Sequence, residues 1–174
     1  MKKIIVVMMI ILLTAACKQK EEPKGQYQFP AGPIVSQDDT KLLEEFVKKE
    51  PGNVDAWIKY GNALMDTKRF NEAIDAYQKA LAINPKNIDA RVDMGTCYRN
   101  IGKPDLAVKE YRKALEMDPG HLNAHMNLGI VLAYDLQDKA QAVKEFEKVM
   151  ELDPNGPNSA QIRLLVQQLK SSKK

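Results

Sequence analysis

The sequence has few of the residues from which catalytic and metal sites are built. Its 174 residues include two histidines, two cysteines and one tryptophan. Basic and acidic residues nearly balance, at 26 and 23, so the chain lacks the strong positive charge typical of nucleic-acid-binding proteins. No segment predicts a strand followed by a Gly-rich phosphate-binding loop. The composition therefore argues against an enzyme and against a nucleic-acid-binding protein.

The few chemically versatile residues do not form a recognisable site. His121 and His125 are four residues apart, a spacing that can place two ligands on one metal, but the local sequence supplies no third ligand. Cys97 has neither a nearby histidine nor a Cys-x-x-Cys partner, so we expect a packed thiol. We expect no cofactor and no metal, and a histidine metal site is the least favoured alternative.

Apolar runs long enough to span a membrane are also missing. The longest, residues 4–13, falls short of the roughly 18 apolar residues that a membrane-spanning helix needs. It follows Lys2 and Lys3 and ends in the small residues Thr14, Ala15 and Ala16, which is typical of a signal peptide.

Residues 15–17, Ala-Ala-Cys, resemble the lipobox of bacterial lipoproteins, although Thr14 stands where that family usually has leucine. The resemblance implies a lipoprotein signal peptide over residues 1–16 and lipidation of Cys17, which would anchor the protein in a membrane through its N-terminal lipid. In such lipoproteins, aspartate directly after the lipidated cysteine signals retention in the inner membrane. Lys18 stands at that position here, so the resemblance implies that the protein is located at the periplasmic face of the outer membrane. The alternative is an ordinary secretory peptide cut near Ala16.

Residues 17–35 contain three prolines and two glycines and show no apolar periodicity. This composition predicts a flexible, lipid-anchored tether. A binding role for Tyr27 and Phe29 within it is a second interpretation.

Beyond the tether, the sequence repeats with a period of 34 residues. Self-similarity at one period over many positions indicates stacked structural repeats. The repeated positions include Pro51, Pro85 and Pro119; Gly61, Gly95 and Gly129; and Trp57, Arg91 and His125.

Within one unit the pattern predicts two helices. Trp57, Gly61 and Leu64 fall on one helical face. Gly61 costs about 1 kcal/mol of helix propensity relative to alanine, a cost that is acceptable where another helix passes close by. Tyr77 supplies a large side chain from the second helix, and Pro85 ends that helix because it has no amide hydrogen to donate.

These residues resemble the tetratricopeptide repeat, a helical hairpin with Trp, Leu-Gly, Tyr, Ala, Phe, Ala and Pro at set positions. The resemblance implies an all-α, right-handed α-solenoid of three hairpins, over residues 54–87, 88–121 and 122–156. The third unit has one extra residue, which we expect in its inter-helix turn at residues 135–139.

The flanking segments predict a cap at each end of the solenoid. Residues 36–53 predict a half-repeat helix with Ser36 as its N-cap. Residues 157–174 predict a C-terminal capping helix and tail, with Ile162, Leu165, Val166 and Leu169 on one apolar face. The total is eight helices.

By resemblance, a partner peptide would lie in a groove lined by the second, fifth, ninth, twelfth and thirteenth residues of each unit. Many of these residues are apolar and lie between polar ones, which suits an amphipathic helix or an extended peptide. The basic two-carboxylate clamp of the chaperone-tail readers is missing, since Ile58 and Asn123 are not basic. The groove residues are Asp55, Ile58, Asn62, Met65, Asp66, Asp89, Val92, Thr96, Arg99, Asn100, Asn123, Met126, Ile130, Ala133 and Tyr134.

The resemblance implies a lipid-anchored adaptor of the bacterial cell envelope that binds a peptide or helix of another envelope protein. We expect it to support assembly of an envelope complex, of the pilus or secretin, outer-membrane protein or cytochrome c maturation type. The alternative is a structural lipoprotein that self-associates as a homo-oligomer and has no dedicated peptide ligand.

Overall fold

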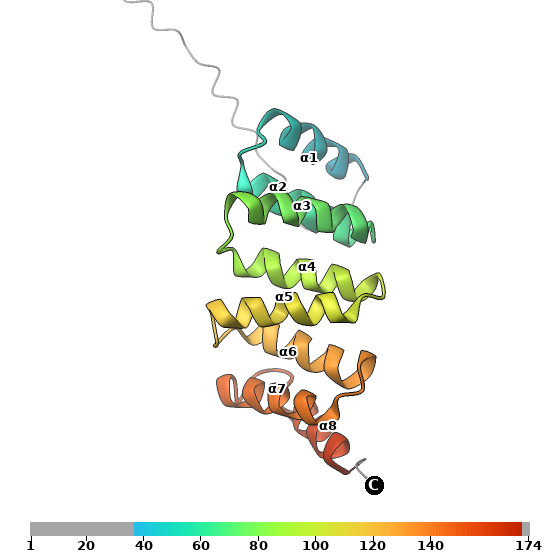
Figure 1. Cartoon of the computed structure of the whole chain (residues 1–174), viewed down its shortest axis with the longest axis vertical. Helices are drawn as coiled ribbons and strands as arrows, with labels where there is room; N and C mark the ends of the chain where they lie inside the picture. Colours follow the sequence, from blue (N-terminus) through green and yellow to red (C-terminus); the bar gives the residue numbers. More distant parts are fainter. Residues whose placement is uncertain (1–36, 172–174) are drawn as a thin grey trace, which may run out of the picture. The chain divides into compact units, whose positions relative to one another are not determined.

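The computed structural model describes residues 37–171, all of whose regular elements are helical (Figure 1). The predicted signal peptide, Cys17, the tether and Ser36 lie outside the described residues. The described elements are α1 (Gln37–Lys49), α2 (Val54–Asp66), α3 (Phe70–Ile83), α4 (Ile88–Asn100), α5 (Pro104–Met117), α6 (Leu122–Ile130), the π-helical turn η1 (Val131–Asp135), α7 (Lys139–Leu152) and α8 (Ser159–Ser171).

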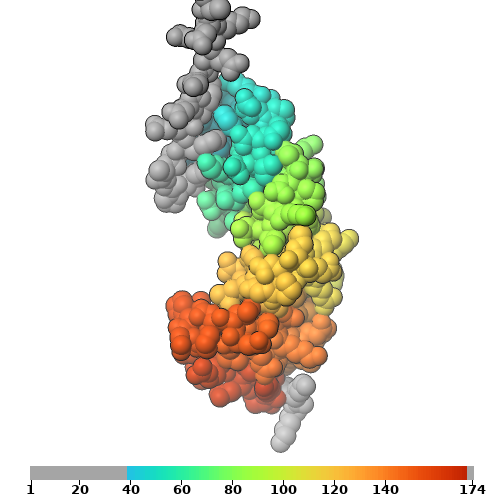
Figure 2. Space-filling view, turned by 90° about the vertical axis from the view of Figure 1, so that its left-hand side faces the viewer, coloured from blue at the N-terminus to red at the C-terminus, as the bar shows by residue number. Residues whose placement is uncertain are grey.

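The helices pack as three hairpins that follow one another in chain order. α2 packs on α3, α4 on α5 and α6 on α7, and successive hairpins meet through α3 with α4 and α5 with α6. α1 covers the first hairpin at α2, and α8 packs against α7. The space-filling view shows the units in the same order (Figure 2). The predicted α-solenoid with a helix at each end is confirmed.

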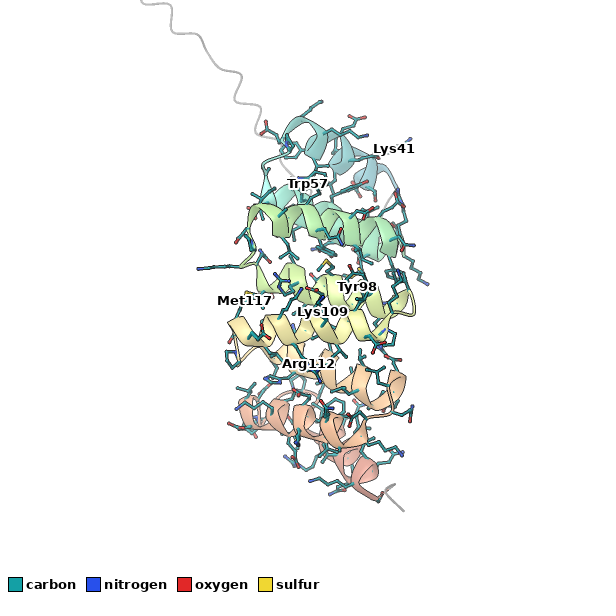
Figure 3. The ribbon with its side chains drawn as sticks, viewed as in Figure 1. Lys41, Trp57, Tyr98, Lys109, Arg112 and Met117 are labelled. Carbon is teal, nitrogen blue, oxygen red and sulfur yellow. The ribbon has the colours of Figure 1, made fainter. Side chains whose placement is uncertain are left out.

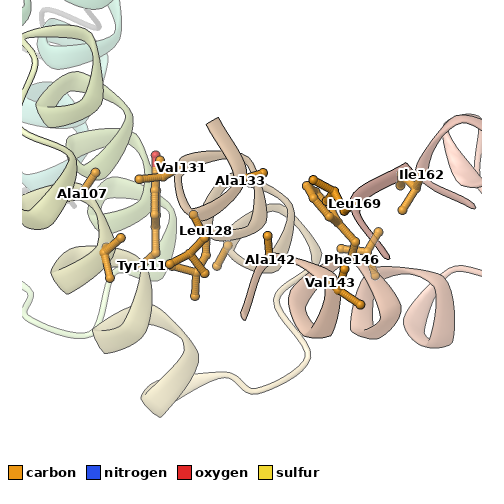
Figure 4. Packing of buried hydrophobic residues seen from close by; sticks show 14 of the residues in the cluster. Ala107, Tyr111, Leu128, Val131, Ala133, Ala142, Val143, Phe146, Ile162 and Leu169 are labelled. Carbon is orange, nitrogen blue, oxygen red and sulfur yellow. The ribbon is translucent and has the colours of Figure 1, made fainter. Parts of the chain in front are cut away.

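A continuous apolar core joins the second half of the solenoid (Figure 4). Tyr111 of α5, Leu128 of α6 and Phe146 of α7 are almost fully buried, and Ile162 and Leu169 of α8 extend the same cluster. α8 therefore shields apolar surface that α7 would otherwise expose, as expected of a capping helix.

Each hairpin is held together by an aromatic ring that lies against a glycine. A Cβ atom at the glycine of the first helix would fall under 3.0 Å from the ring of the second helix, so only glycine fits there. This contact explains why every unit keeps a residue that weakens its own helix. The pairs are Gly61 with Tyr77, Gly95 with Tyr111, and Gly129 with Phe146, at 2.7, 2.6 and 2.8 Å.

The extra residue of the third unit lies in the π-helical turn, so the prediction that placed it at residues 135–139 is wrong. The loop between the two helices has three residues in each hairpin, and its middle residue has positive φ: Lys68, Gly102 and Gln137. The backbone N–H of Leu136 instead donates to Val131 O, five residues back. A π turn accommodates one more residue than an α turn, so the loop keeps its length.

α8 has the sequence pattern of the first helix of a repeat, with one change at the glycine position. Leu164, 35 residues after Gly129, occupies the place of the repeated glycine and is 66% exposed. The neighbouring Arg163 and Gln167 are also exposed. A second helix packed as in the other hairpins would meet a leucine at this position, where the three hairpins have a glycine. In the described part of the chain, the helices are all too short or too polar to cross a membrane.

Candidate functional site

The first helices of the three hairpins, α2, α4 and α6, lie side by side and carry the predicted groove residues. Val92 and Ala133 are instead buried in the core, 4% and 3% exposed, so their side chains serve packing. The other thirteen are accessible to different degrees. Asp55, Asp66, Asp89, Asn100, Asn123 and Tyr134 are exposed, and Ile58, Asn62, Met65, Thr96, Arg99, Met126 and Ile130 are half-buried.

A pocket of about 490 Å³ opens at the C-terminal end of this surface. Arg99, Met126, Ile130 and Tyr134, all predicted groove residues, line one side of it. α8 and the residues before it supply the opposite side, which the sequence had indicated only as a cap. The lining residues from that side are Asn158, Gln161, Ile162 and Leu165, and Phe146 lies at the base.

The apolar character of the pocket follows from how each hairpin pairs its helices. In the first hairpin Tyr77 donates from its hydroxyl to Asn62 Oδ1 at 2.6 Å, and in the second the hydroxyls of Tyr111 and Thr96 lie 3.1 Å apart. The third hairpin has Phe146, which has no hydroxyl, and the matching residue on α6 is Ile130. An apolar ring thus meets an apolar side chain, and no polar group is left unsatisfied.

The π turn brings an unpredicted residue to the edge of the pocket. It shifts the helix register by one residue, so Tyr134 and Asp135 take the places that Met65 and Asp66 hold in the first unit. Asp135 accepts a 2.5 Å hydrogen bond from Arg99 Nε, which links α4 to η1. An exposed pair of this kind contributes little stability, but it occupies the guanidinium of Arg99.

The surface N-terminal to the pocket is acidic. Asp55, Asp66 and Asp89 are exposed, and burial together with the nearby Asp89 carboxylate raises the pKa of Asp93 to about 6. His121 acts in the opposite direction but does not cancel these effects. The whole chain has a net charge of +3, so this negative region is local.

The two histidines have structural partners. His121 Nδ1 accepts from Ala124 N and caps α6, while its Nε2 lies 3.0 Å from Asp89 Oδ1. His125 donates from Nε2 to the carbonyl of Pro119 at 2.9 Å and lies 2.7 Å from Glu145 through Nδ1. No cluster of three or more potential metal ligands occurs among the residues that the structure describes.

Cys97 lies in the core of the second hairpin and is inaccessible to solvent. Burial raises the pKa of its thiol to about 12, with a smaller contribution from Asp93. The reactive thiolate is therefore disfavoured, and the side chain packs as a small apolar group.

The family model described as the cytochrome c-type biogenesis protein H TPR domain matches residues 43–160. No curated protein sequence matches the chain significantly.

Solved structures share the fold at low identity. Crystal structures of MamA include one with a TM-score of 0.69 at 21% identity, which covers 76% of this chain and 77% of that one. The first TPR of Spaghetti (RPAP3), bound to the HSP90 peptide SRMEEVD, has a TM-score of 0.63 at 23% identity, with 68% and 95% covered. The TPR domain of Arabidopsis OM64 has a TM-score of 0.62 at 18% identity, with 66% and 94% covered.

Proposed function

Because the chain belongs to the family of the cytochrome c-type biogenesis protein H TPR domain, we propose that it is a protein-interaction adaptor whose ligand lies along α2, α4 and α6. The observation that carries this proposal is the row of accessible side chains on those helices, which leads into the pocket lined by Met126, Ile130 and Tyr134. Partly exposed apolar side chains beside polar ones suit a peptide or an amphipathic helix.

The similar first TPR of Spaghetti (RPAP3) was solved with a bound peptide, which supports peptide binding as a use of this fold. The specificity must differ here. Neither Ile58 nor Asn123 is basic, and Arg99 is engaged by Asp135. We therefore propose a ligand other than an acidic chaperone tail.

We further propose that Cys17 is lipidated and that the domain works at the periplasmic face of the outer membrane. The lipobox-like residues 15–17 and Lys18 support this. The domain would then hold a segment of another envelope protein during assembly of an envelope complex. Cytochrome c maturation is the type that the family description favours, ahead of pilus, secretin or outer-membrane protein assembly.

Crosslinking and pulldown from native envelopes tests the adaptor proposal. Met126→Glu places a charge at the edge of the pocket, and Ala82→Glu places the same charge on the exposed surface of the second helix α3 as a control. We expect one partner to be captured by the wild type and by Ala82→Glu and to be lost with Met126→Glu. Equal capture by all three proteins would exclude the first-helix surface as the binding site.

Self-association is the second candidate, and Leu164 of α8 favours it because it is 66% exposed at one end of the described solenoid. A mass that increases with concentration in analytical ultracentrifugation, and that Leu164→Gln returns to the monomer, would support this candidate. A constant monomer mass would exclude it.

A further inference from the structure

We infer that the groove selects a cationic segment, in which lysine or arginine side chains accompany one large apolar side chain that enters the pocket between α6 and α8. This inference rests on the proposed adaptor function and adds the chemistry of the ligand. Two independent features carry it, namely the apolar pocket and the acidic side chains at the groove positions of α2 and α4.

The pocket has the size and lining for one apolar side chain. Met126, Ile130 and Leu165 provide aliphatic surface from two helices that are not neighbours in the chain, α6 and α8. Tyr134 lies at its edge and is 55% exposed. The volume of about 490 Å³ exceeds the space that a leucine or phenylalanine side chain needs. Burying such an anchor in a concave apolar site is a common source of peptide affinity.

The carboxylates of the first helices outnumber the cations that could neutralise them. The lysines and arginines of α2, α4 and α6 are Lys59, Arg91 and Arg99. Arg91 pairs with Glu110 and Arg99 with Asp135. Asp55 and Asp66, by contrast, form no ion pair with any residue that the structure describes.

Exposed acids elsewhere on the domain differ among themselves. Glu44 of α1, Glu72 of α3 and Glu147 of α7 each pair with a lysine or arginine of this chain, whereas Asp75 of α3 and Glu116 of α5 form no ion pair with any described residue. The groove is distinguished by the charges at its own positions, where Asp55, Asp66 and Asp89 face one cation, Arg99, which is already paired with Asp135. Burial is the main cause of the raised pKa of Asp93, and the neighbouring Asp89 carboxylate adds to it, which agrees with the excess of acids at the groove positions. A ligand with positive charges would complement this potential, and an acidic ligand would be repelled.

Two labelled peptides of about twelve residues test the inference. Both carry one central leucine, and they differ only in having lysine or glutamate at the same four polar positions. Binding to the full-length chain in non-ionic detergent is followed by fluorescence anisotropy, with detergent alone as the blank. We expect the lysine peptide to bind about tenfold more tightly than the glutamate peptide at low salt, and less tightly as salt is added.

Matched variants assign the effect to the groove. Asp55→Asn combined with Asp66→Asn keeps side-chain size and should weaken binding of the lysine peptide about three- to tenfold, as expected for two exposed charge pairs. Asp75→Asn combined with Glu116→Gln removes two exposed acids from the second helices α3 and α5 and should leave binding unchanged.

Equal binding of the two peptides, or equal weakening by both double variants, would overturn the inference. If neither peptide binds while envelope crosslinking still captures a Met126-dependent partner, the cationic ligand is wrong and the adaptor function stands. If the groove-dependent partner is also missing, both are wrong.

Discussion

Trp57, Arg91 and His125 occupy the same place in three successive units and perform the same task with different chemistry. Each donates a side-chain N–H to the carbonyl of the proline six residues earlier, at 2.9 to 3.0 Å. Arg91 and His125 each also face a glutamate of the second helix, Glu110 and Glu145, whereas the place equivalent to Glu110 in the first unit, residue 76, is an alanine. Arg91 and His125 thus keep the hydrogen bond to the proline carbonyl that Trp57 makes, and each gains an ionic partner.

A second repeated position is also filled by residues that differ in chemistry but perform the same task. Asn53, Asn87 and His121 are spaced by 34 residues, and the side chain of each accepts a backbone N–H at the start of α2, α4 or α6. An N-cap of this kind satisfies a donor that the helix itself leaves unpaired. Both histidines are therefore explained by the architecture of the repeat.

Substituting Gly129 with leucine should destabilise the domain. An added Cβ alone would lie 2.8 Å from the ring of Phe146, which is fully buried and has little room to move. We expect a loss of about 1–3 kcal/mol in the free energy of unfolding, measured by chemical denaturation. Gly52→Ala is the control, because nothing lies within 4 Å of its added Cβ. Equal stability of the two variants would show that the third hairpin is packed differently.

Replacing Asp93 with asparagine should stabilise the domain in a pH-dependent way. The pKa of Asp93 is raised from 3.8 to about 6 in the folded state, so its protonated form is favoured by folding and stability falls as pH rises between these values. The free energy of unfolding of Asp93→Asn should therefore be about 1–3 kcal/mol higher than that of the wild type at pH 7. The difference should vanish below pH 4. A gain that is the same at pH 4 and pH 7 would contradict the raised pKa.

The spacing of side chains along the sequence predicts the helices and how they pair. It does not predict where the backbone hydrogen-bond register changes within a helix. The hairpins follow from the glycine, aromatic and proline positions, and α1 (Gln37–Lys49) lies within residues 36–53, where the sequence predicts a helix. The π turn was missed because an extra residue can be absorbed by the helix end or by the loop, and both leave the same side-chain spacing. The role of α8 in the pocket was missed because its pattern indicates which side is buried, not what its edge borders.

The pairing of α6 with α7 can be tested by converting it to the type found in the second hairpin. Phe146→Tyr alone places a hydroxyl beside Ile130 and should cost about 1–3 kcal/mol, since that group has no partner. Adding Ile130→Thr supplies the partner that Thr96 gives Tyr111 at 3.1 Å. A double-mutant cycle should then show favourable coupling of about 0.5–1.5 kcal/mol. Coupling near zero would mean that residues 130 and 146 do not pair as the equivalent residues do.

At the scale of the whole molecule, the solenoid separates its two surfaces by function. The second helices carry exposed charged residues such as Lys109 and Arg112 of α5 (Figure 3). The groove positions of the first helices carry Asp55, Asp66 and Asp89, and they lead into an apolar pocket that α8 completes. Because α8 packs against α7 as the last of the described helices, the same helix covers the apolar core and forms part of the candidate site.

Lipid anchoring concerns the whole molecule, because it would determine at which membrane the domain meets its partner. Cys17→Ser should abolish membrane association while the helical signal in circular dichroism is unchanged, because the predicted attachment lies outside the described domain. Cell fractionation with immunoblotting measures this. Membrane association that persists through an acylated N-terminus would contradict the proposed lipidation of Cys17.

Site-specific photo-crosslinking in native envelopes tests whether the first-helix surface and its pocket hold the partner. A photoreactive phenylalanine derivative replaces Tyr134, which is 55% exposed at the pocket, or Lys109, which is exposed on α5. We predict one discrete crosslinked partner from position 134 and none from position 109. The same crosslinks from both positions, or a partner captured from position 109 alone, would contradict the claim.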